Sequence, residues 1–337
     1  MKAARLFSLS VFVILLAYGV VGFYFLPQAS FQGDLTRVGV LPESLFGWRK
    51  SQPVVPADLL VQSPMGEADV LVVGDSFSDG LVWQTVLVGS GFKVRTLSWD
   101  TVRGVCDDTV GRLRALGFNG RYVVLEVIER NLQSTLDRSL ACHEATFHLG
   151  PRDDARRGPP LVRSDPDNLP SSGRLSIGIK TALNAARYLT AARQPGFGML
   201  QASSDVTVAR VKDGCQLFSH TACEDTLYFT SEASADADPR AVQKMVGLNS
   251  RLSGITPIWA VVPNKSSVYL GPDEVFWTQA VRQLRSVDLL RASRQALADR
   301  VVDLYPANNT HYSTSGYLMM GREILGVLRE SDTKEAR

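Results

Sequence analysis

The chain has 337 residues, of which 45% are hydrophobic and 21% charged, and its formal net charge is +2. These are the proportions of a globular protein with room for one large domain or two smaller ones. With so small a net charge, the protein lacks the strong positive electrostatic field that would indicate nucleic acid or another polyanion as partner. No heptad, solenoid repeat, Rossmann or P-loop glycine pattern is present.

The N-terminus carries two basic residues, Lys2 and Arg5, followed by a segment from Leu6 to Leu26 without a charged residue. A helix of that length, at about 1.5 Å per residue, crosses the core of a bilayer. Tyr24-Phe-Leu-Pro27 closes the segment without the small residues of a signal-peptide cleavage site. We therefore predict an uncleaved anchor at residues 1–27, with a cleaved signal as the alternative. The basic residues predict a cytoplasmic N-terminus in the inner membrane and a periplasmic body.

Residues 28–67 contain turn and breaker residues without strong periodicity, which predicts a juxtamembrane linker packed partly onto the following domain. The domain itself is predicted to span residues 68–330. In its first part, strands are expected at about 68–73, 93–99 and 121–129. Helices are expected from the turn at residue 76 to about 89 and over 101–116.

An insertion over residues 131–254 interrupts the alternation of strands and helices. Its composition predicts a long loop over 150–174, a helix over 175–193 and a second helix over 238–252. Short strands are expected at 206–211 and 226–229. The alternation then resumes with a strand at 255–262, a helix at 274–299, a strand at 301–305 and a helix at 313–329. This order predicts an α/β fold, a three-layer α/β/α sandwich with a mainly parallel sheet.

The even number of cysteines fits an oxidising compartment. Cys215 and Cys223 enclose a short segment that a disulfide can close into a small loop, which leaves Cys106 and Cys142 as the other pair. No spacing is CxxC, so no zinc site is expected, and no other metal or cofactor site is predicted.

The strongest candidate for chemistry is the stretch from Ala68 to Gly80, in which an apolar run ends abruptly in Gly-Asp-Ser. Ser76 then stands in a turn between a strand and a helix, at the carboxyl edge of a parallel sheet. In α/β folds this place suits a nucleophile with backbone N–H groups beside it. The alternative is a serine that only caps the helix.

A serine nucleophile needs a base to take its proton. Three of the histidines, His143, His148 and His220, are expected to be surface or packing residues. His311 lies in a loop between the last predicted strand and the last helix, at the same edge of the sheet as Ser76. We therefore expect Ser76 and His311 to form a pair.

The Gly74-Asp-Ser-Phe77 turn and a late Thr310-His311-Tyr312-x-x-x-Gly316 loop resemble the SGNH/GDSL hydrolase superfamily. Three further segments are similar to its alginate O-acetyltransferase branch: Val124–Leu132, Val262–Tyr269, and Gln283–Arg285 with Val302–Leu304. The resemblance covers about 70–132 and 258–328 and leaves the insertion unmatched.

Two features depart from that branch. The serine precedes the histidine loop here, an order that a circular permutation of the same fold allows. The branch has Asp in Asp-x-His, whereas this chain has Asn309-Thr310-His311. An amide orients an imidazole but does not supply the negative charge that stabilises an imidazolium.

The resemblance implies an O-acetyltransferase that modifies an extracytoplasmic exopolysaccharide through an acyl-serine, with Ser76 as nucleophile and His311 as general base. A membrane-bound O-acyltransferase partner would supply the acetyl group, because acetyl-CoA is cytoplasmic. Two other functions stay open: a carbohydrate acetylesterase, and a catalytically weak glycan-binding or scaffold subunit of an acetylation complex.

Further residues are assigned to the site as expectations. The oxyanion would be bound by the Ser76 N–H and that of Gly104. Arg130 and Asn131 would line the site, with a structural salt bridge or hydrogen bond as the alternative role. Lys265 and Tyr269 would contact sugar.

Overall fold

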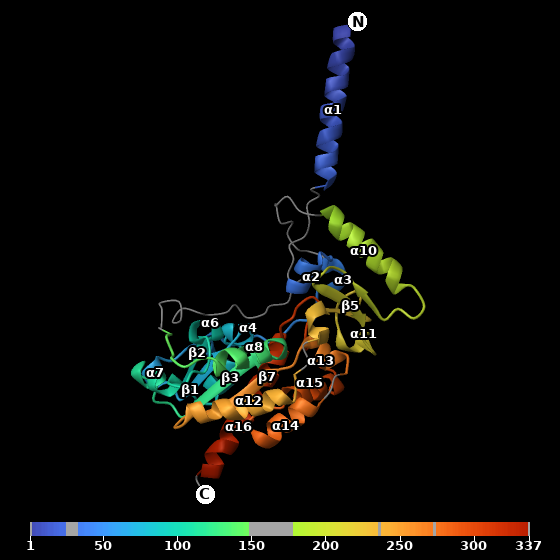
Figure 1. Cartoon of the computed structure of the whole chain (residues 1–337). Helices are drawn as coiled ribbons and strands as arrows, with labels where there is room; N and C mark the ends of the chain where they lie inside the picture. The colour runs from blue at the N-terminus through green and yellow to red at the C-terminus, as the bar shows by residue number, and fades with distance from the viewer. Residues whose placement is uncertain (1, 25–32, 148–177, 235–236, 272–273, 336–337) are drawn as a thin grey trace. The chain divides into compact units, whose positions relative to one another are not determined.

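A computed structural model describes residues 2–24, 33–147, 178–234, 237–271 and 274–335. Two compact units are formed: Lys50–Arg163, Ser231–Pro306 and Thr310–Arg337 make up the larger, and Met1–Arg49, Ser164–Thr230 and Ala307–Asn309 the smaller. Figure 1 follows the chain through its elements. The expected loop over 150–174 lies outside the described residues.

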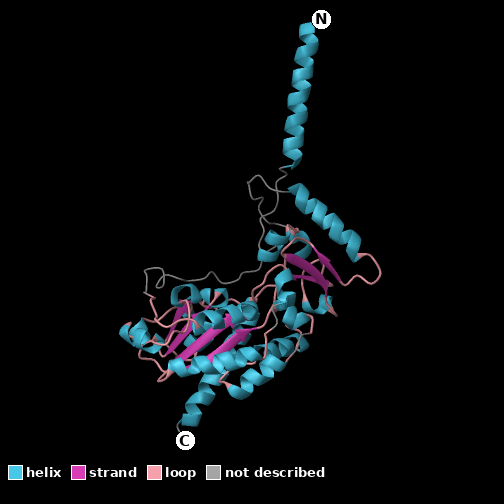
Figure 2. Ribbon diagram, viewed as in Figure 1, coloured by secondary structure: helices cyan, strands magenta, loops and turns pink. Residues whose placement is uncertain are grey.

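The larger unit is built on a parallel sheet of four strands in the order β2-β1-β3-β7 (magenta in Figure 2). Every residue of β1, β2 and β3 is buried, as expected for strands covered on both faces. The expectation of an α/β fold with a parallel sheet is confirmed. The strands are β1 (Val70–Gly74), β2 (Val94–Ser98), β3 (Tyr122–Ile128) and β7 (Thr256–Val262).

The larger unit also contains helices before, between and after these strands. They are η1 (Ala57–Leu59), η2 (Met65–Glu67), α4 (Ser76–Asp79), α5 (Gln84–Gly89), α6 (Trp99–Val102), α7 (Thr109–Ala115), α8 (Glu129–Leu140), η3 (Thr230–Ser234), α12 (Arg240–Asn249), η4 (Ser250–Leu252), α13 (Lys265–Tyr269), α14 (Val275–Gln283), α15 (Leu289–Ala298) and α16 (Thr314–Glu335).

Three predicted helices are each broken in two. The helix expected from residue 76 to about 89 is interrupted between α4 and α5, where Leu81 has a positive φ of 56°. The helix expected over 101–116 is interrupted after α6, where Arg103 takes a positive φ of 64° that α-helix does not allow. The helix expected over 274–299 is interrupted between α14 and α15. There the chain runs beside β7, with Trp259 N donating to Arg285 O (2.8 Å) and Val287 N donating to Trp259 O (2.9 Å).

The strand expected at 301–305 is absent, because Arg300 and Asp303 both have φ near 56° and turn the chain. The loop between residues 304 and 313 is instead closed by a hydrogen bond from Ser313 N to Leu304 O (2.9 Å), just before α16.

The strand order places a topological switch point between β1 and β3. From β1 the chain moves to β2 on one side and later to β3 on the other, so the connections diverge at the carboxyl ends of β1 and β3. Open parallel sheets bind their ligands in the crevice at this point. The Ser76 turn follows β1, and Glu129 to Asn131 follow β3.

The smaller unit contains an antiparallel sheet in the order β4-β5-β6 and short helices that share its core. Leu35, Leu41 and Phe46 are fully buried against Val206, Val208 and Leu227. The prediction of a linker over 28–67 is therefore wrong for 33–49, which belong to this core. The elements are α2 (Asp34–Gly39), α3 (Glu43–Phe46), α10 (Gly178–Ala192), β4 (Met199–Gln201), β5 (Val206–Arg210), α11 (Gly214–Leu217) and β6 (Asp225–Phe229).

The N-terminal helix α1 (Lys2–Tyr24) contains one segment, Ala3–Val21, that is long and apolar enough to cross a membrane. A signal sequence satisfies the same criterion. Two disulfides, Cys106–Cys142 and Cys215–Cys223, have the expected pairing. Disulfides favour a compartment outside the cytoplasm, so both features fit an exported body.

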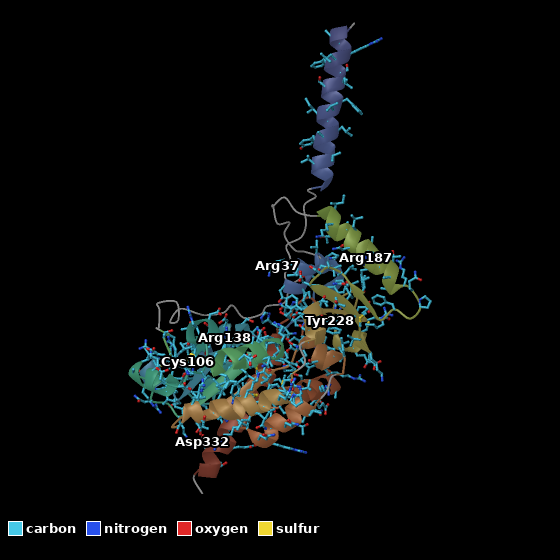
Figure 3. The ribbon with its side chains drawn as sticks, viewed as in Figure 1. Arg37, Cys106, Arg138, Arg187, Tyr228 and Asp332 are labelled. Atoms are coloured by element: carbon cyan, nitrogen blue, oxygen red, sulfur yellow. A yellow bond between two sulfur atoms is a disulfide. The ribbon has the colours of Figure 1, made fainter. Side chains whose placement is uncertain are left out.

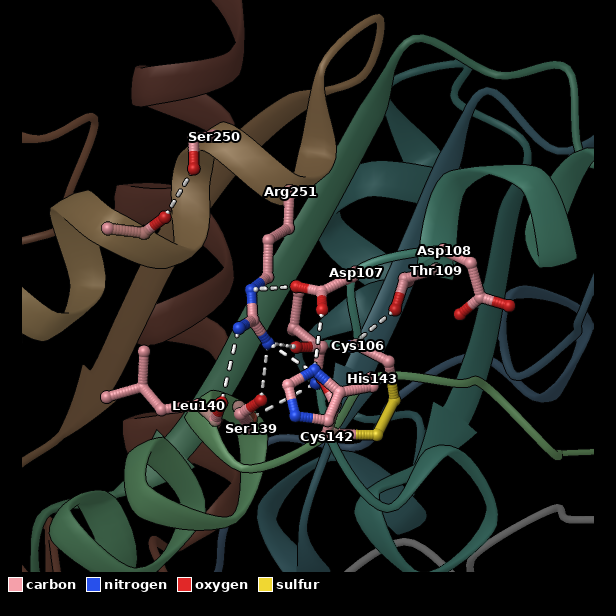
Figure 4. Close-up of polar contacts among 12 residues, drawn as sticks. Cys106, Asp107, Asp108, Thr109, Ser139, Leu140, Cys142, His143, Ser250 and Arg251 are labelled. Atoms are coloured by element: carbon pink, nitrogen blue, oxygen red, sulfur yellow. Dashed lines mark hydrogen bonds and ion pairs between the residues drawn. A yellow bond between two sulfur atoms is a disulfide. The ribbon is translucent and has the colours of Figure 1, made fainter.

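Arg251 ties the first disulfide to the end of α8 (Figure 4). Its guanidinium donates to the carbonyls of Ser139 (2.6 Å) and Leu140 (3.2 Å), in the last turn of α8, and to that of Cys142 (3.0 Å), two residues beyond the helix. Asp107 pairs with Arg251 on one side (2.9 Å) and with His143 on the other (2.8 Å). Those two partners lower the pKa of Asp107, with the His143 hydrogen bond as the larger cause.

Replacing Arg251 with Ala is expected to lower the free energy of unfolding by about 3 kcal/mol, because several buried carbonyls lose their donor. Urea unfolding of the full chain in detergent measures the change. Arg240→Ala is the matched control: its side chain is 89% exposed, and the expected change is below about 0.5 kcal/mol. Equal effects of the two substitutions would contradict the role of Arg251.

Candidate functional site

The turn between β1 and α4 needs a glycine at its entry. A Cβ on Gly74 would lie 2.6 Å from Glu126 Oε2 and would collide with Ser78 Oγ. Asp75 then caps α4, because its Oδ1 accepts from Phe77 N (3.0 Å). Its Oδ2 accepts from Ile128 N (2.8 Å), which links the turn to the carboxyl end of β3.

Glu126 also stabilises this turn. It is fully buried on β3, and its Oε2 accepts from Asp75 N (3.0 Å) and from Ser78 Oγ (2.7 Å). Burial raises the pKa of the Glu126 carboxyl well above its usual value, and the negative charge of Asp75 raises it further. The group therefore keeps its proton at pH values at which an exposed glutamate is ionised.

Ser76 and His311 lie side by side in the larger unit. His311 Nε2 is 2.8 Å from Ser76 Oγ, the distance of a hydrogen bond between a base and a nucleophile. Ser76 is exposed and His311 partly so, and thus both are open to solvent. Ser76 is the first residue of α4, and no acceptor among the described residues bonds its N–H.

A cluster of aromatic rings fixes the histidine. The Phe77 ring lies 4.9 Å from the His311 ring, and the rings of Tyr305, Tyr312 and Tyr317 lie around Phe77 at 5.7 to 6.4 Å. Tyr312 shares a hydrogen bond of 2.7 Å with Ser293. Burial raises the pKa of the Tyr305 and Tyr312 hydroxyls, which therefore remain protonated.

Lys265 and Tyr269 support the histidine loop rather than face a ligand. Lys265 is 1% exposed, and its Nζ donates to Pro306 O (2.7 Å). The Tyr269 hydroxyl accepts from Tyr305 N (3.3 Å), and burial raises its pKa, with a smaller contribution from the charge of Asp303. The expected sugar contact is corrected for Lys265, because its ammonium is buried. The sugar contact expected of Tyr269 also lacks support, because its hydroxyl is hydrogen-bonded to the backbone of Tyr305.

Of the other predicted site residues, Gly104 and Arg130 are bonded within the protein and Asn131 is exposed. The Gly104 N–H donates to Val102 O (2.8 Å), so in this conformation it is not directed at an oxyanion. Arg130 makes the alternative contact expected of it, an ion pair with Glu232 (3.8 Å). Asn131 is exposed in the first turn of α8.

The second nitrogen of the histidine, His311 Nδ1, lies 3.3 Å from Thr310 Oγ1. Asn309 belongs to the segment Ala307–Asn309 of the smaller unit, in which the neighbouring Asn308 O accepts from Leu35 N (3.0 Å). The orienting role of Asn309 stays a prediction.

No protein-family model and no curated protein matches the chain. Within the described residues, no group of three or more His, Cys, Asp or Glu side chains is arranged to hold a metal ion.

Sequence reasoning missed Glu126 and the aromatic cluster. Glu126 could have been found from its place in the sequence, as the acidic residue within an otherwise apolar strand. A carboxyl group buried in such a strand needs hydrogen-bond donors nearby. The signal for the cluster was the three tyrosines at 305, 312 and 317 that flank His311.

Glu126→Gln is expected to change the pH dependence of stability. Because the folded pKa of Glu126 is raised, its stabilising contribution is complete below the unfolded pKa of about 4.5 and is lost as pH rises through the folded pKa. Glutamine does not ionise, so the variant should gain stability relative to wild type as pH rises above about 4.5. Urea unfolding of the full chain over a pH series measures this.

Glu330→Gln serves as the matched control, since Glu330 is exposed on α16. Its pH profile should stay parallel to that of the wild type. A parallel profile for Glu126→Gln as well would contradict the raised pKa.

Proposed function

We propose that the chain is an O-acetyltransferase of the SGNH type that acetylates an extracytoplasmic polysaccharide through an acyl-serine. Its larger unit would then be the three-layer α/β/α domain of that superfamily, with residues 131–254 as an insertion. The observation that carries the proposal is the 2.8 Å contact between Ser76 Oγ and His311 Nε2 at the switch point of the sheet.

In the first half of the reaction, His311 Nε2 accepts the proton of Ser76 Oγ while the oxygen attacks the carbonyl carbon of an acetyl donor. The Ser76 N–H stabilises the oxyanion, and the aromatic cluster keeps the imidazole in line. The tetrahedral intermediate collapses when His311 returns the proton to the leaving group. Acetyl-Ser76 remains.

In the second half, His311 takes a proton from a sugar hydroxyl, which attacks acetyl-Ser76. The proton then returns to Ser76 Oγ, and acetylated sugar leaves. The exposure of Ser76 supports a polymeric acceptor, because a chain of sugars can lie across an open site. Asn131, exposed after β3, is the side chain assigned to this acceptor.

The proposed location is the periplasmic face of the inner membrane, with α1 as the retained anchor. Acetyl-CoA does not reach that compartment. A membrane-bound O-acyltransferase that passes acetyl across the bilayer is therefore the proposed donor partner.

Two other functions use the same region. An acetylesterase needs the same residues with water as acceptor, and the open dyad also admits water. A weakly catalytic glycan-binding or scaffold subunit is favoured by Asn309, which stands where the resembled branch has a carboxylate.

The full chain in detergent, given an activated acetyl ester with and without oligosaccharide, separates these functions. We expect acetylated oligosaccharide and, without acceptor, an acetyl adduct on Ser76 by mass spectrometry. Ser76→Ala and His311→Ala should each lower the rate roughly a thousandfold or more. Ser90→Ala, an exposed serine of the same unit, should leave the rate unchanged.

Each other outcome selects a different function. Free acetate with no acetylated sugar would replace transfer with hydrolysis. Equal rates for wild type and Ser76→Ala would reject both enzymes and leave the binding subunit.

Asn309→Asp is expected to speed formation of the acetyl-enzyme, because a carboxylate stabilises the imidazolium formed in that step. Stopped-flow release of the leaving group measures the rate. Thr310→Val is the matched comparison, since it removes the oxygen 3.3 Å from His311 Nδ1. A rate that responds to Thr310→Val and not to Asn309→Asp would assign the orienting role to Thr310.

A further inference from the structure

The helix α10 of the smaller unit differs in charge from the rest of the chain. The net charge of the whole protein is +2, whereas the stretch from Gly178 to Ser204 holds three basic residues and no acidic one. The basic residues, Lys180, Arg187 and Arg193, are exposed, and no ion pair joins them to another described residue. Figure 3 labels Arg187 on α10.

One face of α10 is fixed against the core of its own unit. Tyr188 is 3% exposed, and its hydroxyl donates to Asp225 Oδ2 (2.7 Å). Asn184 Nδ2 donates to the carbonyls of Gly39 and Val40, both at 3.2 Å. These contacts determine which side of the helix faces away from the core.

The outer face of α10 is apolar along its middle. Ala182, Leu183, Ala186 and Leu189 are exposed, and Leu183 and Leu189 have 64% and 39% of their surface accessible. At about 100° per residue these four positions share roughly a third of the helix circumference. Lys180 and Arg187 border this stripe along one side, between it and the face that packs on the core, and an apolar stripe with basic residues at its edge is the pattern of a helix that lies in a membrane interface.

The chain also restricts where this unit can go. Eight residues, 25–32, separate the end of α1 from Gly33, and a chain of that length spans at most roughly 30 Å. With α1 in the bilayer, the unit that carries α10 is confined to the membrane surface. This confinement raises the effective concentration of α10 at the lipid headgroups, so a short apolar stripe suffices for binding.

We propose that the outer face of α10 docks on the anionic surface of the bilayer in which α1 is anchored. Leu183 and Leu189 enter the boundary between headgroups and acyl chains, and the three basic side chains contact lipid phosphates. Two copies pairing through this face would bring like charges together. The inference depends on retention of α1 and is independent of the catalytic assignment.

Tryptophan fluorescence of the full chain reconstituted in bilayers tests the proposal. All five native tryptophans are buried, at 5% exposure or less, so a new tryptophan at Leu183→Trp reports on α10. In bilayers with anionic, bromine-labelled lipid we expect a blue-shifted emission that the bromine quenches. Val281→Trp is the matched control: it replaces an exposed valine (44%) on α14 of the larger unit and should not be quenched.

Charge is tested separately. Quenching of Leu183→Trp should weaken with added salt, in neutral bilayers, and when Lys180, Arg187 and Arg193 are all changed to Glu. Unchanged emission of the native tryptophans checks that this variant folds.

Three results would overturn the proposal: quenching no stronger than for Val281→Trp, equal quenching in neutral and anionic bilayers, or an emission shift that follows protein density rather than lipid charge. The last result would indicate contact between copies.

Discussion

Carboxyl oxygens hold the turn on which the candidate site depends. Asp75 accepts from the backbone of Phe77 and Ile128, and Glu126 accepts from the backbone of Asp75 and the hydroxyl of Ser78. These bonds join the end of β1 to β3 and to the start of α4, so the two carboxyl groups determine the direction of Ser76. Without them an exposed serine in a short turn would have no fixed orientation toward His311.

The histidine is fixed by a different kind of interaction. His311 lies on the ring of Phe77, the residue next to the serine, and Tyr305 and Tyr312 support that ring from the loop that carries His311. Nucleophile and base therefore share one support, since Phe77 belongs to the same turn as Ser76. Lys265 also supports the histidine loop, because it donates to the carbonyl of Pro306.

The sequence patterns anticipated the sheet and the proximity of Ser76 and His311, because a continuous apolar run is a strong sign of a buried parallel strand. They were less informative where a single backbone angle ends a helix or prevents a strand. Arg103, Arg300 and Asp303 have positive φ values that no local sequence pattern predicts. The strand expected before His311 is missing, and aromatic contacts place the loop instead. Residues 33–49 looked like a linker because their apolar partners, such as Val206 and Leu227, are far away in the chain.

The pairing of β3 has a consequence for how the protein is made. β3 lies between β1 and β7, and its partner residues in β7 come late: Tyr122 pairs with Thr256 and Ile128 with Val262. During synthesis, the 178–230 segment of the smaller unit therefore emerges before β7 does. Until then β3 presents an unpaired apolar edge, the kind of surface on which chains aggregate. Cys106 precedes β3 and Cys142 follows α8, and both are synthesised before β7. Their disulfide can therefore close the segment that contains β3 and α8 before β7 is present to pair with β3.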